Sequence, residues 1–142
     1  MYRARDVMTA EVATVSPKST VKDCIRTLLT KRISGAPVVG DDGTLLGIIS
    51  EYQLLEVIYD PDANGMLVED VMTKSVFSVD ESAFLPEVAN LFIMHRIRRV
   101  PVLKQGLLVG VITRRDLLRY SVEAEDQIDS LFGRMRDHAG SH

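Results

Sequence analysis

Thr113 follows directly on a short apolar run that ends at Ile112, and Asp116 lies three residues further on. This pattern predicts a buried strand that leads into a helix, with both side chains at the helix N-terminus. A carboxylate there can accept hydrogen bonds from both hydroxyls of a ribose, and the unpaired N–H groups of the first turn favour phosphate. The same spacing suits a capping box, in which the two side chains bond N–H groups of their own helix. The local sequence leaves both roles open, and one pair of residues can serve both.

Ser50 and Gln53 repeat this arrangement earlier in the chain, after the apolar run 47–49. Glutamine still serves in a capping box. However, its neutral amide is a poorer acceptor for a diol than a carboxylate is. We therefore predict one competent ligand site, at Thr113 and Asp116, and a second, weaker site at Ser50 and Gln53.

The two copies belong to a longer internal repeat. Arg5-Asp6-Val7-Met8-Thr9 returns as Glu69-Asp70-Val71-Met72-Thr73. Further matches keep the same order and nearly the same offset: Val15 with Val79, Arg32-Ile33 with Arg96-Ile97, and Pro37-Val38 with Pro101-Val102. A match that keeps one register over most of each unit indicates a duplication.

The sequence pattern of each unit predicts the order strand, helix, strand, strand, helix. The first unit has an extended piece at 12–15, a helix capped by Ser19 or Thr20, a hairpin of strands 36–39 and 45–49, and a helix at 52–59. The last helix of the second unit is predicted over 114–122. Apolar residues at helical spacing predict the core-facing stripes of the two earlier helices. These stripes are Val21, Cys24, Ile25, Leu28 and Leu29 in the first unit, and Leu85, Val88, Ala89, Phe92 and Ile93 in the second.

The predicted domain organisation is a first repeat at 1–59, a linker at 60–66, a second repeat at 67–122 and a C-terminal helical tail at 123–142 with a disordered end. The linker is short and rich in turn residues, so the units should pack on each other. Each unit alone would bury too little surface for more than marginal stability. The tail carries four apolar residues at helical spacing: Ile128, Leu131, Phe132 and Met135. The predicted fold class is α+β (mixed α/β).

Composition narrows the functional classes. A chain that is 46% hydrophobic and 26% charged is typical of a folded domain, and its net charge of −3 makes nucleic-acid binding unlikely. One cysteine, Cys24, and the lack of any apolar run long enough for a membrane span favour a cytoplasmic location and no membrane. No nucleophile–base pair and no metal-ligand spacing is present, so we expect neither an enzyme nor a metal site.

The ordered set of Asp-Val-Met-Thr, a Pro-Val strand and Gly-x-Ile-[Thr/Ser]-x-x-Asp at a helix start resembles the cystathionine-β-synthase-type (CBS) domain. Two copies in tandem resemble a CBS pair, also called a Bateman module, and the likeness covers about residues 3–122. It implies two units of β-α-β-β-α order packed as a pseudo-two-fold pair, with ligand clefts between them. It also implies a regulatory sensor that binds an adenosine nucleotide (AMP, ADP or ATP) or S-adenosylmethionine, forms a homodimer and acts on an effector protein that the sequence does not name.

The resemblance also assigns site residues. Thr113 and Asp116 would contact the ribose, with Val111 beside it. The adenine wall would come from the first repeat: Met8, Ala13, Ile33, Ser34, Ala36 and Pro37. Arg99 and Arg115 would bind the phosphates, since a guanidinium binds two oxygens at once. The alternatives are core packing for the wall, a solvated basic face for the arginines, and, for the whole chain, a structural homodimerisation module with vestigial clefts.

Overall fold

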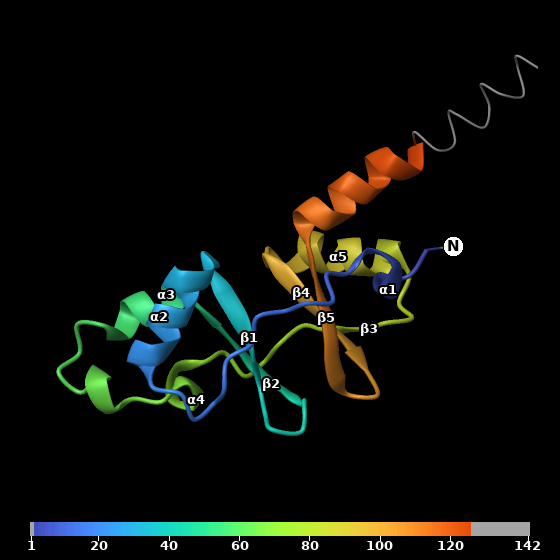
Figure 1. Ribbon diagram of the computed structural model, residues 1–142. Helices are drawn as coiled ribbons and strands as arrows, with labels where there is room; N and C mark the ends of the chain where they lie inside the picture. Colours follow the sequence, from blue (N-terminus) through green and yellow to red (C-terminus); the bar gives the residue numbers. More distant parts are fainter. Residues whose placement is uncertain (1, 126–142) are drawn as a thin grey trace, which may run out of the picture.

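Each repeat folds as a helix, a two-stranded hairpin and a second helix in the computed structural model, which describes residues 2–125. In the first repeat these elements are α2 (Val21–Lys31), β1 (Gly35–Val39), β2 (Leu45–Ser50) and α3 (Glu51–Val57). In the second they are α5 (Leu85–His95), β4 (Arg99–Lys104), β5 (Leu107–Thr113) and a helix over 114–125. The hairpins lie at the centre and the helices lie outside them (Figure 1). The predicted α+β class is confirmed.

Shorter elements complete each unit. They are α1 (Ala4–Val7), η1 (Ala63–Gly65), α4 (Val68–Val71) and β3 (Val79–Asp80). β3 runs parallel to β4, which is antiparallel to β5. In the first unit the predicted strand at 12–15 is reduced to Val15, whose N–H donates to the Pro37 carbonyl at 3.0 Å beside the antiparallel pair of β1 and β2. The two sheets therefore follow one plan, with the first less regular than the second.

The core-facing stripes are narrower than predicted. Thr20, not Ser19, caps α2 by accepting a hydrogen bond from the Asp23 N–H at 3.1 Å. Most of the inner positions of both stripes are buried, but Leu29 is 70% exposed and Ile93 is 76% exposed. These two residues occupy equivalent positions at the edge of each stripe. A single helix buries only the side chains directly over its small sheet, so the prediction that both lie in the core was wrong.

The N-terminal segments of the two repeats are exchanged. The Ala4 N–H donates to the Ala83 carbonyl at 2.7 Å, and Ala4 is fully buried in the core of the second unit. In the same way, the Val68 N–H donates to the Ser19 carbonyl at 2.8 Å, and Val68 is fully buried in the core of the first unit. Neither core is complete without a segment of the other repeat, so we expect the two units to unfold as one.

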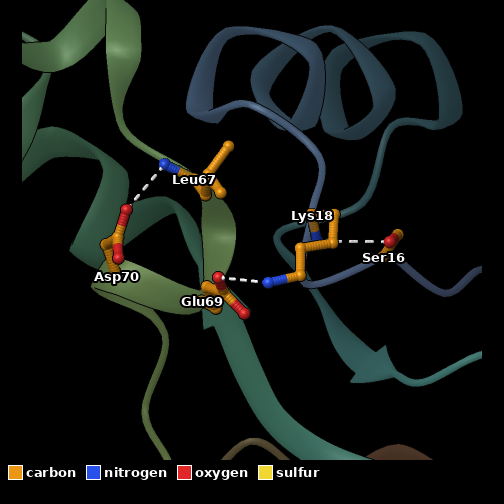
Figure 2. A network of polar contacts seen from close by, with 5 residues as sticks. All are labelled: Ser16, Lys18, Leu67, Glu69 and Asp70. Carbon is orange, nitrogen blue, oxygen red and sulfur yellow. Dashed lines mark hydrogen bonds and ion pairs between the residues drawn. The ribbon is translucent and has the colours of Figure 1, made fainter.

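Polar contacts hold the exchanged segment around α4 in place against the first repeat (Figure 2). Lys18 Nζ lies 2.8 Å from Glu69 Oε1, an exposed pair that contributes little by itself. The Asp70 carboxylate accepts a hydrogen bond from the Leu67 N–H at 3.0 Å and so closes the single turn of α4. Asp6 does the same for α1 through the Arg3 N–H at 2.7 Å. The aspartates of the repeated Asp-Val-Met-Thr motif therefore cap short helices.

The Cys24 thiol is buried in α2, with 1% of the residue exposed, and burial raises its pKa. Because the thiolate is the reactive form, we expect the native protein to react with iodoacetamide at about pH 8 much more slowly than the urea-unfolded chain. A matched variant carrying Cys24→Ala and Arg26→Cys moves the thiol to a position whose native side chain is 64% exposed. It should react quickly even when folded. Equal rates for native and unfolded wild type would contradict the buried position.

The helix that follows β5 is described as far as residue 125, beyond the end predicted at Val122. The predicted tail residues Ile128, Leu131, Phe132 and Met135 lie outside the described residues. Within residues 2–125, none of the helices has the length and apolar character that a bilayer crossing requires. The cytoplasmic location stays a prediction.

Candidate functional site: two clefts between the repeats

Thr113 and Asp116 form a complete capping box. The Thr113 N–H donates to Asp116 Oδ2 at 2.8 Å, and the Asp116 N–H donates to Thr113 Oγ1 at 3.2 Å. The other carboxylate oxygen, Oδ1, lies 3.6 Å from Nη1 of Arg119, whose side chain is 64% exposed. The Asp116 side chain is only 12% exposed, but the arginine is mobile at the surface and the separation is long, so the pair is weak and a ligand can compete with it. The capping role is confirmed, and Oδ1 can still accept a ligand hydroxyl.

A cavity of about 200 Å³, here called the Thr113 cleft, lies between the repeats. It brings together six of the residues assigned by the resemblance: Ala13, Ile33, Pro37, Arg99, Val111 and Thr113. Thr9, Glu11, Val12 and Gly35 complete its lining. Most of this wall comes from the first repeat, while Thr113, Val111 and Arg99 come from the second. The arrangement offers an apolar slot for a flat ring with polar groups at one end.

Five other predicted residues do not line this cleft. Asp116 lies three residues after Thr113, half-buried at the start of the helix that follows β5. Met8 packs its Sδ against Gly110, where an added Cβ would lie 2.5 Å from the sulfur. Ala36 is 1% exposed and belongs to the core of the first unit. Arg115 is exposed on the helix after β5, and Ser34 lines the opposite cleft. In the side-chain arrangement described here, Met8 and Ala36 act as packing residues rather than as a ligand wall.

A larger cavity of about 680 Å³, here called the Gln53 cleft, lies at the equivalent place of the other repeat. Gln53 Oε1 accepts a hydrogen bond from the Ser50 N–H at 2.7 Å, and Gln53 Nε2 donates to the Thr73 hydroxyl of the second repeat. The amide therefore caps α3 and also ties the two repeats together. This cleft has more room than the Thr113 cleft but no carboxylate equivalent to Asp116. Its lower affinity stays a prediction.

Sequence reasoning missed the aromatic side of the Gln53 cleft. Phe77 lines this cleft and is 44% exposed, and its ring stacks on His95 with the centroids 3.9 Å apart and the planes at 18°. Tyr52, which is 75% exposed, also contributes to the lining. The repeat register contained the signal, because Phe77 matches Ala13, which had already been assigned to a ligand wall. The phenylalanine in one copy and the alanine in the other differ so much in size that the match did not indicate a shared role.

Arg99 lines both clefts. Its Nη2 donates to Ser34 Oγ at 2.6 Å, and its guanidinium lies over Gly35. Burial lowers the pKa of Arg99, as does the nearby charge of Arg98, while Glu51 opposes them. An arginine nevertheless stays charged in proteins. None of the ion pairs found within residues 2–125 includes Arg99. This half-buried cation therefore favours an anion in either cleft.

Comparison with known families identifies the chain. The model of the CBS domain matches twice, over residues 4–60 and 68–123. The chain therefore belongs to the CBS-domain family and contains a tandem pair of these domains. The resemblance inferred from its motifs is confirmed.

Relatives and solved structures agree with this assignment. Hypoxic response protein 1 of Mycobacterium tuberculosis is 30% identical over 125 residues, which cover 87% of each chain. The crystal structure of CBSX2 in complex with AMP has a TM-score of 0.81 and 31% identity, over 88% of this chain and 99% of that one. CBSX2 comes from Arabidopsis thaliana. The protein MJ1225 of Methanocaldococcus jannaschii is 30% identical over 81% of this chain, which spans only 41% of that protein's length.

One solved relative contains metal ions. The crystal structure of Hypoxic Response Protein I contains two coordinated zinc ions and has a TM-score of 0.78 and 30% identity, over 84% of this chain and 99% of that one. Among the residues described here, no three His, Cys, Asp or Glu side chains are grouped so that they could hold a metal ion. The expectation of no metal site stays a prediction.

Proposed function

We propose that this CBS pair is a regulatory sensor that binds an adenosine nucleotide (AMP, ADP or ATP) between its repeats. Asp116 and Thr113 bind the ribose, the apolar wall of the Thr113 cleft holds the adenine, and Arg99 binds the phosphate. The observation that carries the proposal is one cavity lined by the apolar wall of one repeat together with Thr113 and Arg99 of the other. The AMP complex of CBSX2, a similar protein, supports this class of ligand.

Two features favour a nucleotide over S-adenosylmethionine. Arg99 is a half-buried cation in a cleft, and a planar guanidinium matches a phosphate better than it matches a sulfonium ligand, which is itself positively charged. Arg119 adds a second positive charge beside Asp116. We propose no catalytic step, because the sequence contains no nucleophile–base pair that could perform one.

Ligand binding should appear as thermal stabilisation. We expect at least one of AMP, ADP and ATP to raise the midpoint of thermal unfolding of the wild type, since a ligand at 100 times its dissociation constant adds roughly 2.7 kcal/mol of stability. Asp116→Gln should lose most of this shift, because it copies the residue at Gln53 and so keeps a capping side chain without the ribose carboxylate. Differential scanning fluorimetry of both proteins with each nucleotide and with S-adenosylmethionine measures the effect.

Asp70→Gln is the matched control. It removes another capping carboxylate, which accepts a hydrogen bond from the Leu67 N–H and belongs to α4, not to the helix start at Thr113. This variant should unfold at a lower temperature without ligand but keep the full nucleotide shift. If no nucleotide shifts the wild type, the sensor is excluded and the structural dimerisation module is left. An equal shift in Asp116→Gln would place the ligand elsewhere.

We also propose that the chain forms a homodimer through its exposed helices. Leu29 and Leu55 are 70% and 61% exposed along a groove of about 200 Å³ between α2 and α3. The equivalent residues of the second repeat, Ile93 and Leu118, are 76% and 67% exposed. The duplication thus places two apolar patches on one chain, and a second copy presents the same pair, as a two-fold symmetric interface requires. The effector protein that responds to the ligand is not identified by these patches.

A further inference from the structure

We propose that the two clefts share a single phosphate-binding side chain, Arg99, so that a phosphorylated ligand in one cleft weakens the binding of a second in the other. This inference rests on the proposed function and concerns the coupling between its sites. It predicts that the chain discriminates between one and two bound nucleotides, whereas a ligand without phosphate experiences two independent clefts.

The position of Arg99 in the fold places it between the clefts. Arg99 begins β4, and its counterpart in the first repeat, Gly35, begins β1. From there the guanidinium reaches across to the first repeat, donates to Ser34 Oγ at 2.6 Å and lies over Gly35. Ser34 belongs to the lining of the Gln53 cleft and Gly35 to that of the Thr113 cleft, and Arg99 belongs to both.

The duplication is asymmetric at the position of Arg99. An arginine at both equivalent positions would give each cleft its own guanidinium, but the first repeat has glycine. Gly35 also provides the space that Arg99 occupies, since a Cβ there would overlap the Arg99 guanidinium. Glycine at residue 35 therefore means that the first repeat supplies no guanidinium of its own, and it also leaves room for the guanidinium of Arg99. The two clefts are left with one half-buried guanidinium between them.

Other charged groups near the clefts do not replace Arg99. Arg98 lines only the Gln53 cleft and is exposed, so solvent and salt screen its attraction for a phosphate. Glu51 lines the Gln53 cleft and Glu11 lines the Thr113 cleft, and both carboxylates repel a phosphate. Two phosphates on one guanidinium would also bring like charges together, which disfavours the doubly bound state. The second binding step is therefore weakened, not abolished.

Isothermal titration calorimetry with AMP and adenosine on three forms of the full chain tests the coupling. The first form is the wild type, and the second is Asp116→Gln, which removes the proposed ribose carboxylate of the Thr113 cleft. The third is Ser75→Trp, which fills the Gln53 cleft with a large side chain at an exposed lining residue. Whichever cleft fills second in the wild type should bind AMP roughly 5- to 150-fold more weakly than it does when the other cleft is disabled. Adenosine should show no such difference.

Arg99→Gln and Arg98→Gln separate the shared residue from a general basic surface. Arg99→Gln should weaken AMP binding in both clefts and make the two steps independent, with its thermal unfolding recorded to verify folding. Arg98→Gln should weaken only the Gln53 cleft and leave the coupling intact. Three outcomes would overturn this inference while leaving the proposed function intact. They are two independent AMP-binding steps in the wild type, a single binding step for both AMP and adenosine, and coupling that persists in Arg99→Gln. No AMP, ADP or ATP binding would overturn the proposed function with it.

Discussion

Gly47→Ala is expected to lower the free energy of unfolding by about 1–3 kcal/mol, the usual cost of forcing extra atoms into a packed site. A Cβ at residue 47 would lie 2.7 Å from Met72 Sδ and 2.7 Å from the Thr73 carbonyl oxygen. The sulfur can move, but that carbonyl accepts a hydrogen bond from the Ile48 N–H at 2.9 Å. The exchanged segment cannot withdraw without losing this bond. Urea unfolding followed by circular dichroism measures the change.

Gly65→Ala is the control for this prediction, because nothing lies within 4 Å of a Cβ there. Its effect should stay within about 0.5 kcal/mol, as for most surface substitutions. Gly110→Ala tests the other exchanged segment, where a Cβ would lie 2.5 Å from Met8 Sδ and 3.0 Å from the Thr9 carbonyl oxygen. It should destabilise less than Gly47→Ala, since the backbone oxygen, which cannot move aside easily, lies 3.0 Å from the added Cβ here and 2.7 Å from it at residue 47. If Gly47→Ala behaves like Gly65→Ala, the segment at residue 73 does not pack on β2.

The double variant Leu55→Lys and Leu118→Lys is expected to convert a dimer into a monomer at micromolar concentration. Fully burying a leucine contributes about 1.5–3 kcal/mol, and in a symmetric dimer each substitution counts twice. Removing both patches should therefore raise the dimer dissociation constant by more than roughly 100-fold. Analytical ultracentrifugation of the wild type and the variant at several concentrations measures this change.

Thr30→Lys is the matched control, because Thr30 is exposed on α2 and helical spacing places it away from the groove that Leu29 lines. This variant should remain dimeric. A wild type that sediments as a monomer at every concentration would exclude the homodimer. A double variant that stays dimeric would place the interface on another surface. Both variant residues lie outside the Thr113 cleft, so the nucleotide shift assigned to that cleft can be measured on the monomer.

The candidate site could be predicted from the sequence where its residues act locally. The capping box joins Thr113 and Asp116, which lie three positions apart, and its hydrogen bonds follow from the geometry of a helix start. The family resemblance also assigned Ala13, Ile33 and Pro37 to a wall, and these residues do line the Thr113 cleft. It could not separate Ala36 from Pro37, because the choice between core and cleft depends on which elements cover each face of β1.

By itself, the sequence determined the duplication, the order of helices and hairpins, their caps and turns, and the family. Each of these depends on contacts between residues close in the chain or on motifs that recur in both repeats. Only the tertiary structure decided that the segment at residues 2–9 completes the core of the second repeat and the segment at residues 66–73 that of the first. The same holds for the stacking of Phe77 on His95 and for the contact of Arg99 with Ser34. These contacts join residues far apart in the sequence, and the composition of either partner does not predict the other. Their geometry depends on how the two repeats pack, which no local pattern records.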